Sequence, residues 1–265
     1  MLIGRIYVRI NSLAPHLTFI VGMLITGPVQ PQAAQPSREA SDSIWVSYVG
    51  DHPISDRWEL HLEGYGAWVD PDHHRDFFFV RPGVRRKFPH DFSSLLSYGY
   101  FSFSPSRTGA TVSLSEHRLS QDVQWSHRLF GSSRDKPTLS HRLRYEERFR
   151  SSESSKSQQT QWNFRQRARY RMTFRLPLRE HPDRPWPSYA SVYNETFINL
   201  KPLGNARVLS QNSTSAALGW HLSKHFDFEL GYLHQYVPSP SGIIGVHNHI
   251  ATMTLFSRLP LRMKH

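Results

Sequence analysis

The sequence contains no cysteine and no hydrophobic run long enough to cross a membrane as a helix. Its longest apolar stretch, residues 17–27, falls short of the roughly 20 residues that a helical span requires. Hydrophobic residues make up 38% of the chain and the mean hydropathy is −0.52, which is low for a helical membrane protein. Without cysteine there are no disulfides, so an exported form of this chain needs another source of stability. A closed, hydrogen-bonded barrel supplies one.

The N-terminal segment has the composition of a secretory signal peptide. Arg5 and Arg9 precede the short apolar run, and small residues near Ala34 follow a break that contains proline. We therefore expect residues 1–34 to form a cleaved signal peptide, followed by a leader and a short strand in residues 35–56. A buried N-terminal strand or helix is the alternative interpretation.

The chain is strongly basic, with 32 Lys and Arg residues against 21 Asp and Glu residues and a formal net charge of +11 at pH 7. Such an excess is typical of nucleic-acid-binding proteins. Here, however, the arginines alternate with apolar residues along strand-like segments, and glutamates such as Glu116, Glu146 and Glu195 are interspersed among similar segments. We therefore expect no nucleic-acid partner.

Residues 161–176 show this alternation most clearly. The odd positions from Arg165 to Arg175 are mostly arginine, whereas the even positions carry residues such as Trp162 and Phe164. A period of two predicts a strand with one charged face and one apolar face. Unpaired charge is too costly to bury in a dry core, so the arginines need water or acidic partners. A soluble sandwich wets its charged face, whereas a membrane barrel turns its apolar face outward and keeps a polar interior.

The rest of the chain favours the barrel. Several strand candidates are longer than the roughly 5–6 residues common in soluble sandwiches and reach the roughly 9–11 that a tilted membrane strand needs. Short turns at residues 89–91 and 222–224 alternate with long polar loops at residues 151–160 and 238–245, as in outer-membrane barrels. Tryptophan and phenylalanine gather towards the strand ends, which is typical of an interfacial girdle, and we expect these rings to face outward.

We therefore predict an all-β fold, an antiparallel up-and-down transmembrane β-barrel of about ten strands (10–12) in residues 57–258. Antiparallel closure leaves no place for the short strand at residues 43–50, which we expect to lie inside the barrel or to cap it. The alternation breaks near Leu119, which we interpret as a bulge. Residues 259–265 form a basic tail.

Several short motifs occur in order along the chain. They are ISDRWELHLEG at residues 54–64, HRLRYEERF at residues 141–149, RQRARYRMTFRLPL at residues 165–178, YNETFINL at residues 193–200 and HNHIATMTL at residues 247–255. This ordered set resembles the DUF2490 family of Gram-negative bacterial proteins, over about residues 43–258. The resemblance implies an outer-membrane-type β-barrel and adds no chemistry, because the family's function is uncharacterised.

Charged residues of the strands are the candidate functional site. We expect these to form a polar network in the barrel interior: Glu116, Arg118, Arg144, Glu146, Arg148, Arg165, Arg167, Arg169 and Glu195. Arg and Glu side chains paired across strands satisfy each other where the dielectric constant is low. Their role is either structural, as ion pairs that fill a narrow barrel, or solute-binding, as a lining that interacts with anions. The expected partners are outer-membrane lipid and a small anionic solute, and the expected location is the cell outer membrane.

Two other functions stay open: an outer-membrane lipid hydrolase, and a soluble periplasmic β-protein that binds an acidic ligand. A hydrolase needs a serine within hydrogen-bond reach of a histidine. Adjacent residues on a strand, such as Ser140 and His141, point to opposite faces, so we favour a non-enzymatic role. The pairs His247–His249 and His73–His74 could bind a divalent metal weakly. We expect a polar surface at both places, with neither a metal nor a cofactor.

Overall fold

The alternating pattern folds into β-strands throughout the part of the chain that the structure describes. The structure is a computed structural model, and it describes residues 42–69, 77–103, 106–107, 110–111, 114–131, 135–153, 160–178, 186–201, 207–239 and 245–261. The expected signal peptide, residues 1–34, and the pair His73–His74 lie outside the described residues.

Within these ranges all the regular elements are strands. Their bounds are β1 (Asp42–Pro53), β2 (Trp58–Val69), β3 (Phe77–Phe88), β4 (Phe92–Phe103), β5 (Ser106–Arg107), β6 (Ala110–Thr111), β7 (Leu114–Arg128), β8 (Thr138–Glu153), β9 (Thr160–Pro177), β10 (Tyr189–Asn199), β11 (Leu209–His221), β12 (Phe226–Val237) and β13 (Val246–Ser257).

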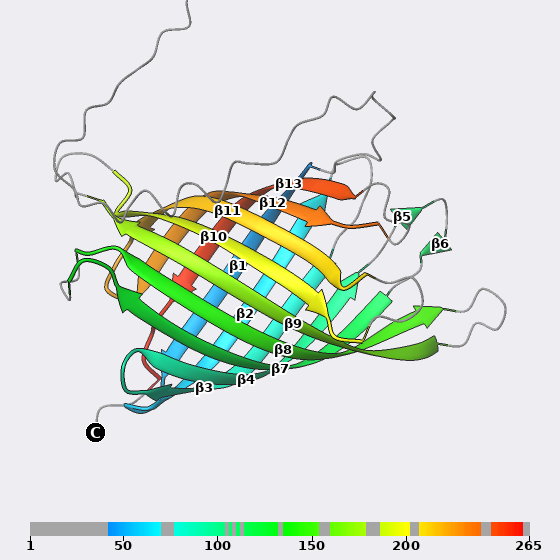
Figure 1. Cartoon of the computed structure of the whole chain (residues 1–265), viewed down its shortest axis with the longest axis horizontal. Helices are drawn as coiled ribbons and strands as arrows, with labels where there is room; N and C mark the ends of the chain where they lie inside the picture. The colour runs from blue at the N-terminus through cyan, green and yellow to red at the C-terminus, as the bar shows by residue number, and fades with distance from the viewer. Residues whose placement is uncertain are drawn as a thin grey trace, which may run out of the picture. The chain divides into compact units, whose positions relative to one another are not determined.

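Eleven of the described strands form a closed barrel, and β5 and β6 make a separate two-stranded sheet (Figure 1). From β2 to β13 the barrel strands pair antiparallel in sequence order, with β4 pairing directly with β7. This confirms the predicted all-β barrel and a strand count close to ten. The sheet is nevertheless mixed, because β1 and β13 close it in parallel.

The prediction that the first strand lies inside the barrel or caps it is wrong. β1 belongs to the wall, where it pairs antiparallel with β2 and parallel with β13, in a register that runs from Asp42↔His249 to Gly50↔Ser257. The expectation assumed antiparallel closure, which requires an even number of strands. An odd strand instead closes the sheet in parallel, and it satisfies the backbone groups that β2 and β13 would otherwise leave unpaired at two edges.

β7 also differs from the prediction, because its register with β4 and β8 is continuous through Leu119 and leaves no bulge there. Leu119 points outward, and the inward-facing Ser120 and Asp122 are buried. The alternation is hard to see in the sequence because a polar residue, Gln121, occupies an exposed outward position.

The barrel wall separates two kinds of side chain. Large apolar residues point outward, as Leu143 does with 51% of its surface exposed, whereas their charged neighbours point inward, as Arg144 does with 3% exposed. The outward direction expected for the aromatic rings is wrong for several of them. Phe79 and Phe197 are buried on the inner face, and Trp45, Phe77 and Phe101 also lie in the interior, in contact with one another or with Phe79. The apolar exterior and charged interior are the arrangement that the alternation in β9 predicts.

The two ends of the barrel differ in the connections that they carry. The short-turn end holds the turns at residues 54–57, 89–91 and 222–225, and β13 finishes there. Just beyond β13, Leu261 donates its backbone N–H to Pro53 O at 2.9 Å, which joins the end of the described chain to β1. The opposite end is the one at which β1, β3, β7, β9, β11 and β13 begin.

Candidate functional site

The interior ion pairs start from the register of β8 and β9. This register places Glu146 opposite Arg167, and Arg144 opposite Arg169. Both strands carry their charges at every second residue, so the pairing collects the charged positions into one interior row. Two arginines directly opposite each other repel unless carboxylates reach them. Carboxylates from β7 and β10 do so here.

Glu195 of β10 is one of these carboxylates and is 1% exposed. It accepts hydrogen bonds from three guanidinium groups, Arg142 Nη2 at 2.7 Å, Arg169 Nε at 3.0 Å and Arg171 Nη2 at 2.6 Å. Both carboxylate oxygens are occupied. Glu195 therefore compensates three cations of the interior at once, and among the described residues it is the ion-pair partner of both Arg142 and Arg171.

Glu146 of β8 forms a second such centre. Arg167 Nε donates to Glu146 Oε2 at 2.7 Å, and Arg169 Nη1 donates to Glu146 Oε1 at 2.7 Å. Because Arg169 binds both Glu146 and Glu195, the two centres form one network. The Arg169 guanidinium also lies 4.2 Å from the centroid of the Phe197 ring, a contact that stabilises a cation on its remaining face.

The network continues in the other direction around the barrel. Arg144 donates through Nε and Nη2 to Asp122 of β7 at 2.8 and 2.7 Å, in a bidentate pair that fixes both side chains. Arg81 of β3 lies 3.6 Å from the same carboxylate and also pairs with Glu63 of β2. Ion pairs thus connect strands from β10 back to β2.

Towards the short-turn end, Asp51 of β1 holds a further group. Its Oδ1 atom lies 2.7 Å from His61 Nδ1 and accepts hydrogen bonds from Arg85 Nε at 3.2 Å and Nη2 at 3.1 Å. Arg85 also donates to Gln124 across the interior. The polar contacts therefore extend to β1 as well.

Towards the opposite end, Glu116 of β7 binds two arginines. Arg118 Nε donates to it at 2.5 Å, and Arg148 donates through Nε and Nη2 at 2.6 and 2.8 Å. The Arg118 guanidinium lies 5.0 Å from the ring centroid of Phe101 and 5.6 Å from that of Phe79. These rings belong to an aromatic cluster of the interior that also includes Trp45, Tyr65 and Phe77.

Beside the ion pair of Glu116 and Arg148, the interior carries an excess of positive charge. Arg148 is directly opposite Arg165, and Arg150 is the next inward position along β8. Neither Arg150 nor Arg165 forms an ion pair with any residue of the described ranges. Arg150 is exposed and Arg165 is half-buried, so solvent reaches both. We call Arg148, Arg150 and Arg165 the rim arginines.

Among the predicted interior residues, Arg165 is the one placed outside these ion pairs; the structure brings the other predicted residues into them. Sequence reasoning missed further members of the network, namely Asp51, Glu63, Arg81, Arg85, Asp122, Arg142 and Arg171. A signal existed for most of them, since Arg142 and Arg171 alternate with predicted residues on the same strands. Asp122 was hidden by the assumed bulge at Leu119.

The model of one protein family, described as protein of unknown function (DUF2490), matches residues 42–244 of the chain. The chain belongs to the DUF2490 family. No curated protein and no solved structure matches it. The matched range contains every charged residue of the interior network, and β13 completes the DUF2490 barrel beyond that range.

The outer surface of the DUF2490 barrel carries aromatic residues near both ends, which we call the two aromatic rims. The rim of the short-turn end contains Trp58, Phe88, Phe92, Trp125, Trp220 and Phe228, and the rim of the opposite end contains Tyr98, Tyr100, Phe149, Trp162, Phe164 and Tyr236. Outward histidines contact outward tyrosines: the Tyr98 hydroxyl lies 2.5 Å from His117 Nδ1, and the Tyr232 hydroxyl lies 2.5 Å from His249 Nδ1. The outer surface therefore carries hydrogen-bonding groups beside its aromatic rings.

A few polar residues also lie on the outer surface of the DUF2490 barrel, and they bind one another. Asn194 Nδ2 donates to Asn212 Oδ1 at 3.0 Å and to Thr214 Oγ1 at 2.8 Å, and Asn212 Nδ2 donates to Thr196 Oγ1 at 3.0 Å. The amides and hydroxyls of this group satisfy each other on an otherwise apolar face.

The serine–histidine pairs of the DUF2490 barrel do not assemble a hydrolase dyad in the described residues. Ser140 faces inward, whereas His141 faces outward and binds the Tyr170 hydroxyl at 2.8 Å. Ser115 and His117 share the outer face, but each contacts a tyrosine. The Tyr100 hydroxyl lies 3.2 Å from Ser115 Oγ, and the Tyr98 hydroxyl lies 2.5 Å from His117 Nδ1. No group of three or more His, Asp or Glu residues in the described ranges is arranged to hold a metal ion. None of the described segments forms a helix with the length and hydropathy of a membrane span.

Proposed function

We propose that this DUF2490 chain is an integral β-barrel of the bacterial outer membrane, non-enzymatic, with an ion-paired interior that interacts with small anionic solutes. The observation that carries the proposal is the division of the wall into an apolar exterior and a charged interior. Outward residues such as Leu96, Leu143 and Val192 are 55%, 51% and 48% exposed. Soluble monomers rarely expose an apolar surface that continues around a whole barrel, whereas a lipid-facing wall requires one.

The spacing of the aromatic rims supports the membrane location. On β12, Phe228 of one rim and Tyr236 of the other are eight residues apart, or about 27 Å along a strand. With the tilt of about 40° usual for membrane barrels, this separation projects to about 21 Å along the axis, close to an apolar band of about 25 Å. The paired Asn and Thr side chains between the rims meet the requirement that polar groups in lipid have partners.

The odd strand count fits the location less directly, since bacterial membrane barrels usually have an even number. Parallel closure by β1 nevertheless leaves the barrel wall without an open edge. An open edge cannot be tolerated in hydrocarbon, because each unpaired backbone group there costs several kcal/mol. The closed hydrogen-bonded wall therefore matters more to the proposal than the parity of its strands.

Cell fractionation of the full chain in a Gram-negative host tests the membrane location. We expect the protein in the outer-membrane fraction, resistant to extraction with urea, and we expect boiled and unboiled samples to migrate differently on SDS gels. Recovery in the soluble periplasmic fraction would overturn the proposal in favour of a soluble acidic-ligand binder. Phospholipid turnover by the purified protein would overturn its non-enzymatic part.

The rim arginines support the anion interaction, because Arg150 and Arg165 lack a carboxylate partner among the described residues. An anion bound there would relieve the repulsion between Arg148 and Arg165. We expect sulfate to stabilise the protein against unfolding by about 1.4 kcal/mol at ten times its Kd. Arg165→Gln should remove most of this increment. The measurement is thermal unfolding in detergent, comparing sulfate with chloride at equal ionic strength.

The control for this measurement is Arg207→Gln, because Arg207 is exposed and lies just before β11 at the same end of the barrel. That variant should keep the full response to sulfate. Equal sulfate stabilisation of wild type and Arg165→Gln would contradict an anion site at the rim arginines.

A further inference from the structure

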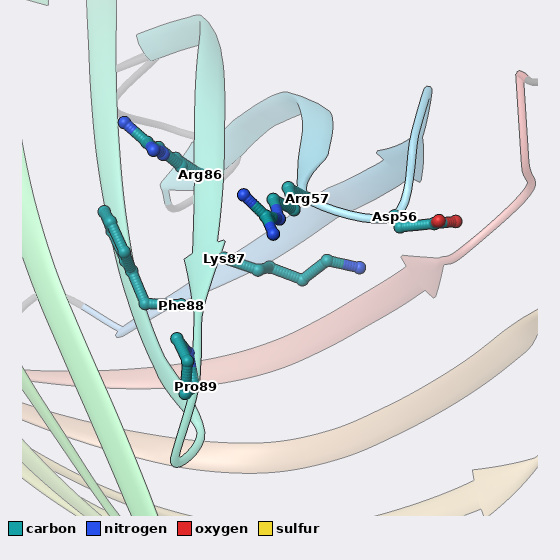
Figure 2. A pocket seen from close by; sticks show the side chains of 6 residues that line it. All are labelled: Asp56, Arg57, Arg86, Lys87, Phe88 and Pro89. Carbon is teal, nitrogen blue, oxygen red and sulfur yellow. The ribbon is translucent and has the colours of Figure 1, made fainter.

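A separate pocket lies at the short-turn end, between the β1–β2 turn and the end of β3 (Figure 2). It has a volume of about 360 Å³ and is lined by Asp56, Arg57, Arg86, Lys87, Phe88 and Pro89. The backbone N–H of Lys87 donates to Arg57 O at 2.8 Å, which fixes the turn against β3. The pocket is therefore built on strand ends held together by hydrogen bonds.

The lining has three cationic side chains and one carboxylate. Lys87 Nζ pairs with Glu59 Oε1 at 2.9 Å. In contrast, Arg57 and Arg86 form no ion pair with any residue in the described part of the chain. Figure 2 shows the Asp56 carboxylate pointing away from both arginines. Two guanidinium groups therefore border the pocket with donors available to an anion.

Arg86 lies on the outer face of the barrel, above two aromatic rings. Its guanidinium carbon is 5.5 Å from the centroid of Trp58 and 5.1 Å from that of Phe88. Stacking on aromatic rings occupies the flat face of a guanidinium and leaves its N–H edge for a planar or tetrahedral oxyanion. Phe88 in turn contacts Phe92, with 5.6 Å between centroids, so the floor of the pocket continues into the apolar exterior.

We propose that this pocket binds the phosphate of an anionic phospholipid, with Arg57 and Arg86 as the phosphate ligands and the Trp58–Phe88 surface against the start of an acyl chain. The inference rests on the proposed membrane location, which would put this aromatic rim at the level of the headgroups. Lipid phosphate suits the pocket better than free phosphate because the cations adjoin exposed rings, which free phosphate would leave in water. The site is distinct from the rim arginines, which lie in the interior near the opposite end.

Native mass spectrometry of the full chain in non-ionic detergent tests the inference. We expect the wild type to retain phosphatidylglycerol in preference to phosphatidylcholine. The double variant Arg57→Gln/Arg86→Gln should bind phosphatidylglycerol at least about tenfold more weakly, because two charge-assisted contacts are lost. Arg128→Gln is the matched control, since Arg128 is an exposed cation at the same end and outside the pocket; its affinity should equal that of the wild type.

Heat-dependent migration on SDS gels, measured on the same samples, shows whether each variant still folds as a barrel. This readout separates a failure of the lipid site from a failure of the proposed membrane location. A double variant that folds as a barrel and binds phosphatidylglycerol as the wild type does would overturn the headgroup site alone. Displacement of the lipid by inorganic phosphate at similar concentration would also overturn it, because the pocket would then recognise phosphate without the lipid. A wild type that never enters membranes would overturn the proposed function instead.

Discussion

Replacing Glu195 with glutamine is expected to destabilise the barrel by about 3–5 kcal/mol, the usual cost of leaving buried charge without its partner. Glutamine has nearly the same size, so the change removes the charge and little packing. Arg142, Arg169 and Arg171 all bind this carboxylate, at 2.6–3.0 Å. The measurement is urea-induced unfolding of the protein in lipid vesicles, followed by tryptophan fluorescence.

Glu229→Gln is the control for this change. Glu229 also faces the interior, but among the described residues it has one ion pair, to the more exposed Arg175 at 3.2 Å. Its loss should cost about 1 kcal/mol or less, as for other solvent-accessible pairs. Equal and small effects of the two substitutions would contradict a structural role for the network around Glu195.

Placing arginine at Leu230 is expected to destabilise the membrane-inserted protein by about 1–3 kcal/mol, because Leu230 lies between an aromatic rim and the middle of the bilayer, where a cation costs about 2–4 kcal/mol. Leu230 lies on β12, points outward and is 40% exposed. In a soluble barrel the same change at an exposed position would alter stability by about 0.5 kcal/mol or less. The loss of stability therefore shows whether this face contacts lipid or water. It is measured by refolding the protein from urea into vesicles.

Leu222→Arg provides the comparison. Leu222 is 61% exposed and lies in the turn at residues 222–225, beyond the aromatic rim. We expect this variant to refold with the stability of the wild type. A Leu230→Arg variant as stable as Leu222→Arg would show that the outer face of β12 meets water.

Much of this fold is predictable because a period of two assigns each residue of a strand to one face. The alternation in β8 and β9 predicts inward arginines and outward rings without knowledge of the partners. It does not predict that Arg169 bridges Glu146 and Glu195, since this contact depends on the register of three strands. Register follows from the whole set of pairings, and a one-residue shift would move Asp122 to the wrong face. The assumed bulge at Leu119 is an error of that kind.

The place of β1 was not predictable by counting strands. Antiparallel closure is the common case, and it excludes an eleventh strand on topological grounds alone. The residues of β1 nevertheless carry the wall pattern, with Ile44 and Val46 exposed outward at 48% and 42% and Trp45 packed against the interior Tyr65. Alternation within a short segment was thus a better guide than the parity of the barrel.

The central claim is that the apolar exterior contacts lipid, and single-cysteine labelling tests it most directly because the chain has no cysteine of its own. A small fluorophore is attached in detergent to Leu230→Cys or to Leu222→Cys, and the protein is then reconstituted into vesicles. We predict that nitroxides on the lipid acyl chains quench the label at position 230 while aqueous iodide does not, and that iodide quenches the label at position 222. Equal quenching of both labels by iodide, with no effect of the nitroxide lipids, would contradict the account.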